Sequence, residues 1–324
     1  MKQIKIFFED YGRCFDKTEE VIMKVLRREY DIVIDPHPDY LFYSCGGYNH
    51  LKYSRCIKIF YTCENMEPDF NFCDYALAHP HLQYGDRYLR TPYYLFSREF
   101  EPMETHPVTD ARKALDRKFC NFVFSSGWAD PVREVFFNKL SEYKRVDSGG
   151  KVLNNMGGRI SDKMTFIKDY KFTIAFENSC LPGYTTEKIV EAMAAGSLPI
   201  YWGNPDVGLD FNKDAFVCLN DFNTPEEAVN EIIRLDNDDE AYLRKLSAPR
   251  CTGADYRAWE DQLFLFLKNI IDRPLSEAKR TTDYGFMYSY RRDMTALRWL
   301  FGKNKMIGKG IRKVLRLLML NNHF

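Results

Sequence analysis

The sequence predicts an α/β protein made of two doubly wound, Rossmann-like domains that face a central cleft. In both halves of the chain, short apolar runs typical of buried strands alternate with helical segments. A charged stretch with two prolines, residues 101–117, separates the halves and reads as a linker. The chain has 324 residues, 45% hydrophobic and 28% charged, which is enough for two globular domains of ordinary size.

Residues 1–100 carry the elements of the first domain. Strand-like apolar runs occur at Ile4–Phe8, Asp31–Ile34, Tyr40–Tyr43 and Ile57–Tyr61. Between the first two runs, Thr18–Glu29 has apolar residues at helical spacing, which predicts an amphipathic helix. The fourth run leads into a polar turn with Glu64, and parallel sheets present ligands at the carboxyl ends of their strands. Glu64 is therefore either a ligand-facing acid or an ordinary turn carboxylate.

Residues 118–290 carry the elements of the second domain. The predicted strands are Phe119–Phe124, Phe172–Phe176, Leu198–Trp202 and Ala215–Leu219. The predicted helices, apart from one inside the central motif described next, are Pro131–Tyr143, Pro225–Leu235, Glu240–Leu246 and Tyr256–Ile271. Alternation of this kind is typical of parallel sheets with crossover helices.

A strand, a polar loop, a helix and a second strand follow one another within residues 172–203. Thr185 or Thr186 can cap the helix, and Glu187 lies in its first turn. The free N–H groups at a helix start suit an anionic ligand, and Lys188 adds a full positive charge there. A capped helix with Glu187 and Lys188 in solvent would need no ligand, so the residues alone allow both interpretations.

Composition excludes several classes of protein. Lys+Arg and Asp+Glu both number 46, and a chain without net charge is not a dedicated nucleic-acid binder. The nine cysteines are scattered without a Cys-x-x-Cys pair, which is typical of reduced thiols rather than of disulfides or zinc. Without a signal peptide or a bilayer-spanning apolar stretch, we expect a cytoplasmic protein. The Asp-x-Asp pattern of Asp236 and Asp238 lies between predicted helices, where capping explains it better than a metal.

Residues 291–324 predict a basic amphipathic tail helix. After Asp293 the chain has no acidic residue, whereas basic residues recur from Arg298 to Arg316. Apolar residues at helical spacing lie on another face, so residues 298–324 suit peripheral contact with an anionic membrane surface. The alternative is that the apolar face packs on the protein and only the lysines are exposed.

Three strings within residues 176–203 resemble the donor-site motif of the α-1,3/4-fucosyltransferases of glycosyltransferase family 10, especially the bacterial members. The strings are Phe176-Glu177-Asn178-Ser179, Tyr184-Thr185-Thr186-Glu187-Lys188 and Pro199-Ile200-Tyr201-Trp202-Gly203. The stretch around Pro131-Val132-Arg133 is similar to the second motif of that family. The resemblance implies the GT-B architecture and GDP-fucose as donor substrate, with no cofactor or metal required. It also implies transfer of L-fucose, with inversion, to a hydroxyl of an N-acetylglucosamine-containing glycan acceptor.

The resemblance also implies roles for individual residues. Arg133, Asn178, Tyr184 and Lys188 would hold the diphosphate of the donor, and Glu177 would orient the loop or touch the nucleotide. Glu187 would offset positive charge developing on the fucosyl ring, and Glu64 would act as general base, with Glu67 as the fallback. The loop Ser179–Gly183 departs from the bacterial pattern. Two alternatives are a transferase of the same architecture for another sugar nucleotide or acceptor, and a glycan-binding protein without activity.

Overall fold

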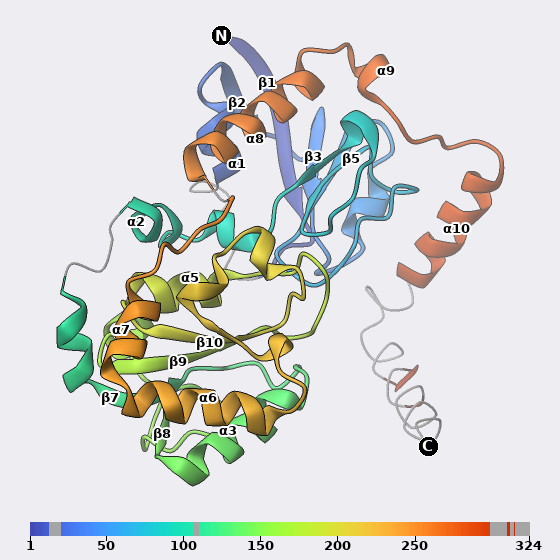
Figure 1. Cartoon of the computed structure of the whole chain (residues 1–324). Helices are drawn as coiled ribbons and strands as arrows, with labels where there is room; N and C mark the ends of the chain where they lie inside the picture. The colour runs from blue at the N-terminus through green and yellow to red at the C-terminus, as the bar shows by residue number, and fades with distance from the viewer. Residues whose placement is uncertain (13–20, 106–109, 254, 299–309, 312–313, 315–324) are drawn as a thin grey trace. The chain divides into compact units, whose positions relative to one another are not determined.

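The computed structural model describes residues 1–12, 21–105, 110–253, 255–298, 310–311 and 314, and it divides into two compact units (Figure 1). The first unit comprises residues 1–78, 82–89 and the chain from residue 261 onwards. The second comprises residues 79–81 and 90–260. Each unit is built on its own β-sheet.

The sheet of the first unit has the strand order β2-β1-β3-β4-β5-β6. Its strands are β1 (Lys2–Glu9), β2 (Tyr30–Ile34), β3 (Tyr40–Tyr43), β4 (Ile57–Tyr61), β5 (Tyr75–Ala78) and β6 (Tyr88–Arg90). The pairings from β2 through β5 are parallel. Strands β3, β4 and β5 are buried along their whole length, as expected for a parallel sheet covered on both faces. Helices of this unit include α1 (Val21–Leu26), α9 (Leu275–Ala278) and α10 (Phe286–Arg298).

The sheet of the second unit has the order β11-β10-β9-β7-β8, with parallel pairs throughout. Its strands are β7 (Lys118–Phe122), β8 (Val146–Ser148), β9 (Tyr170–Phe176), β10 (Leu198–Trp202) and β11 (Val217–Cys218). The first strand, β7, lies between the second and the third, so the direction of winding reverses between β7 and β9. In sheets of this kind, ligands bind at the carboxyl ends of the strands at such a switch point.

Helices cover both faces of this second sheet (Figure 1). On one face lie α3 (Val132–Tyr143) and α6 (Pro225–Asn237), whose apolar sides pack on Phe122, Phe172 and Ile174 in one continuous core. On the other face lies α5 (Glu187–Ala194), beside α2 (Phe100–Thr105). The remaining helices of this unit are α4 (Lys163–Ile167) and α7 (Asp239–Leu246), whereas α8 (Tyr256–Ile271) belongs mainly to the first unit.

Most predicted elements are present, four of them with the predicted bounds: β3, β4, β10 and α8. The periodicity did not reveal β5, β8 or α4, which have three to five residues and are too short to show a period. None of the helices in the described ranges is long and apolar enough to cross a membrane. The predicted tail helix lies mostly outside the described residues.

The boundaries of the two units differ from the predicted domains, which were 1–100, a linker at 101–117, and 118–290. The expected linker is largely helical, as α2 and a short 3-10 helix over Ala111–Asp116, because Phe100 and Met103 are buried by tertiary packing. The chain from residue 261 belongs to the first unit, where the Tyr30 hydroxyl donates to Asp272 Oδ1 at 2.7 Å. Composition cannot reveal either contact, because both join segments far apart in sequence.

Gly150 offers a test of the packing beside the switch point. A Cβ on Gly150 would lie 2.1 Å from the carbonyl oxygen of Phe124, whereas a Cβ on Gly158 would meet nothing within 4 Å. We expect Gly150→Ala to lower the free energy of unfolding by about 1–3 kcal/mol, because backbone must move. Urea unfolding followed by circular dichroism would measure it, with Gly158→Ala as the matched control. Equal midpoints for the two variants would contradict this packing.

Candidate functional site

A pocket of about 420 Å³ opens at the switch point of the second unit. Its wall comes from the chain after β7 and β8, from Asn178 after β9, and from the start of α5. The charged side chains that line it are Arg133, Arg159, Lys163, Lys188 and Glu187. A pocket of the same volume elsewhere in this unit has one arginine and one glutamate, Arg250 and Glu104. Because four cations and only one carboxylate line the first pocket, it is the one of the two that suits an anionic ligand.

Arg133, in the first turn of α3, is 2% exposed and points at the end of β9. Its guanidinium donates to the carbonyl oxygens of Glu177 at 3.1 Å and Phe176 at 3.0 Å, and to Asn178 Oδ1 at 2.5 Å. The guanidinium carbon also lies 4.2 Å from the ring centre of Phe124. Burial lowers the pKa of Arg133, but a guanidinium stays charged in proteins. Its Nη1 is buried without a hydrogen-bond partner, so one strong donor is left for a ligand.

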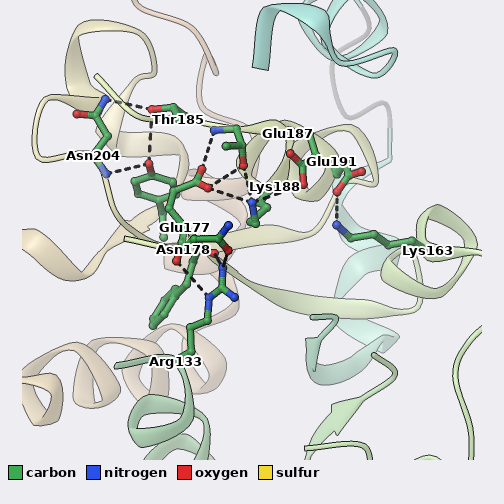
Figure 2. A network of polar contacts seen from close by, with 12 residues as sticks. Arg133, Lys163, Glu177, Asn178, Thr185, Glu187, Lys188, Glu191 and Asn204 are labelled. Carbon is green, nitrogen blue, oxygen red and sulfur yellow. Dashed lines mark hydrogen bonds and ion pairs between the residues drawn. The ribbon is translucent and has the colours of Figure 1, made fainter. Parts of the chain in front are cut away.

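Glu177 is fully buried and joins the end of β9 to the start of α5 (Figure 2). Its carboxylate accepts hydrogen bonds from the backbone N–H and the hydroxyl of Thr186, each at 2.7 Å. The ammonium group of Lys188 donates to the same carboxylate at 3.1 Å and to the Thr186 hydroxyl at 2.6 Å. Thr186 occupies the N-cap position of α5, but its side chain forms hydrogen bonds with Glu177 and Lys188 and does not cap the helix. Glu177 thus fixes both the helix start and Lys188.

Two acids and two lysines face each other along α5 (Figure 2). Glu187 lies 3.5 Å from Lys188, and Lys163 forms an ion pair with Glu191. Burial acts to raise the pKa of Glu187, but Lys188 and Lys163 outweigh it, so this pKa lies below its usual range. Burial acts to lower the pKa of Lys188, but Glu177 and Glu187 outweigh it and raise that pKa. Glu187 is therefore a carboxylate and Lys188 an ammonium at neutral pH.

The loop between β9 and α5 is fixed by Asn204, which the sequence patterns did not reveal. Its side chain accepts from the Gly183 N–H at 2.7 Å and donates to the Thr185 hydroxyl at 3.0 Å, and its N–H donates to the Tyr201 hydroxyl at 3.1 Å. Gly183 has a φ of +78°, and a Cβ there would lie 2.4 Å from the His79 carbonyl oxygen. A glycine is thus needed at this turn.

Four of the predicted site residues, Arg133, Asn178, Glu187 and Lys188, line the same pocket. Two others do not: Glu177 is enclosed behind them, and Tyr184 is buried with its ring edge-on to His79 at 5.2 Å. Neither side chain lines the pocket, so the predicted roles of Glu177 (orienting the loop or touching the nucleotide) and of Tyr184 (holding the diphosphate) stay predictions.

Glu64 is exposed in the turn after β4 of the first unit, where its N–H donates to the Thr62 hydroxyl at 3.1 Å. Asp238 caps α7, accepting from the Ala241 N–H at 2.9 Å, and Asp236 pairs with Lys144 and Lys171. In the part of the chain that the structure describes, no group of three His, Cys, Asp or Glu side chains is placed to hold a metal ion.

Comparison with known proteins gives the family and the fold. Residues 6–97 match the family model of the alpha-(1,3)-fucosyltransferase FucT N-terminal domain, and residues 114–250 match that of the glycosyltransferase family 10 (fucosyltransferase) C-terminal part. The crystal structure of an alpha1,3-fucosyltransferase with GDP-fucose has a TM-score of 0.73 and 28% identity, covering 84% of this chain and 92% of that one.

Curated relatives give the same family. The alpha-(1,3)-fucosyltransferase FucT of Helicobacter pylori is 33% identical over 287 residues, covering 76% of this chain and 60% of that protein. The putative fucosyltransferase R654 of Acanthamoeba polyphaga mimivirus is 31% identical over 186 residues, covering 51% of this chain and 30% of that protein. The chain thus spans less than two thirds of the length of these relatives.

The two parallel-sheet units and the solved alpha1,3-fucosyltransferase they resemble show a fold of the GT-B type, which confirms the predicted fold class. Within that class, the two family models and the Helicobacter pylori relative assign the chain plainly: it belongs to glycosyltransferase family 10, the fucosyltransferases.

Glu177 gives a test of how the site is held together. Replacing a buried carboxylate by alanine leaves the Lys188 ammonium without its buried partner, so we expect Glu177→Ala to cost about 3–5 kcal/mol of unfolding free energy. Glu177→Gln keeps one acceptor for the Thr186 N–H and should cost less. Chemical denaturation would measure both, with Glu134→Gln at an exposed position of α3 as control. Stability in Glu177→Ala equal to that of the control would show that this ion pair does not hold the site.

Proposed function

We propose that this chain is a GDP-fucose-dependent fucosyltransferase that moves L-fucose from GDP-β-L-fucose to a glycan. The observation that carries the proposal is the buried, unpartnered Nη1 of Arg133 beside a pocket with four cations. A diphosphate supplies what this pocket lacks, namely negative charge and several oxygens that accept charge-assisted hydrogen bonds. A relative of the same fold has been solved with GDP-fucose, which supports this donor.

In this proposal, Arg133 and Lys188 bind the diphosphate, with Asn178 holding Arg133 in place. They neutralise the charge that develops on the leaving GDP, and no metal is required for this. Glu187 is ionised and offsets the positive charge of the oxocarbenium-like fucosyl ring. Glu177 and Tyr184 act from behind the pocket, where they fix Lys188 and the loop.

The transfer itself inverts the anomeric centre. An acceptor hydroxyl oxygen bonds to the anomeric carbon while the bond from that carbon to the β-phosphate oxygen breaks, and its electrons stay on GDP. We propose Glu64 as the general base that takes the hydroxyl proton, and Glu67 as the alternative. The acceptor is an N-acetylglucosamine unit of a Lewis-type or O-antigen-like glycan, joined by an α-1,3 linkage. Such a product fits protein glycosylation or lipopolysaccharide biosynthesis in the cytoplasm of a bacterium.

Product analysis tests the reaction. The purified protein, with GDP-fucose and N-acetyllactosamine and without added metal, is expected to give an α-1,3-fucosylated product, identified by mass spectrometry and NMR. Glu187→Ala should lower turnover on the order of 100-fold, because it removes charge stabilisation from the transition state. Release of GDP without a fucosylated product would retain the donor and reject this acceptor. Absence of both turnover and GDP-fucose binding would reject the donor and favour a glycan-binding protein.

The two acids of the turn after β4 serve as each other's control in the same assay. Glu64→Gln should lower turnover by about 10²–10⁴-fold while GDP-fucose binding is retained, because only proton removal is lost. Glu67→Gln should leave turnover close to wild type. The reverse pattern would move the base to Glu67.

We propose that residues 298–324 contact the anionic inner surface of the membrane as a basic amphipathic segment. The full chain should float with vesicles that contain anionic lipid and not with neutral ones, and removal of residues 298–324 should abolish flotation. Equal flotation of both proteins would show that the tail is not the membrane contact.

A further inference from the structure

Two pocket cations, Arg159 and Lys163, have no role in the reaction proposed above. Arg159 is exposed and donates to the Ser125 hydroxyl at 3.0 Å. Lys163, the first residue of α4, lines the same pocket as Arg133 and Lys188. Among the described residues, its only hydrogen-bond partner is Glu191 on α5. Figure 2 shows the Lys163 side chain extended towards α5, with Glu191 beside Glu187. Glu191 does not line the pocket, so the ammonium group lies between a carboxylate behind it and the open pocket.

The backbone that carries Lys163 is well anchored. Asp162 caps α4 by accepting from the Thr165 N–H at 2.6 Å, and the Phe166 ring lies 4.8 Å from that of Tyr170. Ile167 at the end of the helix is fully buried. The Lys163 side chain, 33% exposed, therefore starts from a fixed point on the pocket wall, unlike a lysine on a free surface loop.

The positive charges of Arg133 and Lys188 do not by themselves balance the negative charge of a bound diphosphate. Arg133 and Lys188 carry two positive charges, but Lys188 is already shared by Glu177 and Glu187 at 3.1 and 3.5 Å. The other arginine of the pocket, Arg159, is an exposed side chain that donates to Ser125. A sugar-nucleotide diphosphate brings two negative charges that must be balanced in a partly enclosed site. An ammonium has three N–H donors, so Lys163 can keep its bond to Glu191 and still donate to a phosphate oxygen.

Glu191 orients the Lys163 side chain, and the ammonium group remains charged. Glu187 and Glu191 are four residues apart on α5, where two carboxylates repel each other unless a cation lies between them. Burial raises the pKa of Glu191 despite Lys163, whereas Lys163 contributes to the low pKa of Glu187. The field of Lys163 thus reaches into the pocket.

We infer that Lys163 is a further donor-binding residue, which contacts a phosphate oxygen of the bound nucleotide, and that Glu191 is its positioning residue. The inference rests on the proposed function and adds a third cation to that site.

Titration calorimetry with two probes, GDP and guanosine, tests the inference at constant ionic strength. Lys163→Gln should weaken GDP binding on the order of 10-fold to 100-fold and leave guanosine binding unchanged, because only the phosphates meet the ammonium. Lys163→Arg should recover most of the loss, and Glu191→Gln should weaken GDP by a smaller factor. Lys168→Gln, at the exposed C-terminal end of the same helix, is the matched control and should bind both probes as wild type does.

Each outcome has one meaning. GDP affinity unchanged in Lys163→Gln overturns the inference and leaves the proposed function intact. Equal loss of GDP and guanosine binding assigns Lys163 a structural role and also overturns it. Failure of the wild-type protein to bind GDP would reject the proposed function itself. If Lys163→Gln does not fold, as judged by thermal unfolding without ligand, Lys163→Met keeps the aliphatic stem and takes its place.

Discussion

The site depends on one buried ionic contact, that of the Glu177 carboxylate with Lys188 and Thr186. Glu177 directly follows β9, the central strand of the second sheet, and Lys188 is the second residue of α5, the helix that comes next. An ion pair in a closed interior is tolerated only when its remaining oxygens are hydrogen-bonded, and Thr186 meets that condition with two bonds. The strand end, the loop and the helix start are thereby held in one geometry, and the pocket wall follows from it.

Arg133 completes this arrangement from a different helix. Its guanidinium donates to the backbone carbonyl oxygens of Phe176 and Glu177. The backbone of Glu177 is therefore held by Arg133, while its side chain is held by Lys188 and Thr186. The Nη1 group of Arg133 remains as a buried donor without a partner, beside a pocket lined by a single carboxylate, Glu187. Pre-organised donors of this kind lose little on ligand binding, because no water-facing group must be rearranged. The positive pocket is thus a consequence of how the strand end is secured.

Local sequence patterns predicted the scaffold because the longer core elements are recognisable from their own hydrophobic pattern. Leu198–Trp202 is a continuous apolar run, Ile57–Tyr61 is apolar apart from Lys58, and Tyr256–Ile271 is an amphipathic helix, so each was visible without its neighbours. Short elements such as β8 and α4 carry no period. The compact units differ from the predicted domain limits because residues 100–105 and the chain beyond 261 find their apolar partners far away in sequence.

For the site, the sequence by itself determined the chemistry of the loop: an acid, an amide and a lysine at the start of a capped helix, with an arginine in the preceding βα segment. Only the tertiary structure decided which of these groups face the pocket. Glu177 and Tyr184 are buried and do not line the pocket, whereas the packing of α4 places Lys163 on its wall, a residue that looks like a surface lysine in the sequence. The physical reason is that residue type fixes charge and hydrogen-bonding capacity, whereas exposure and neighbours arise from contacts between segments that are distant along the chain.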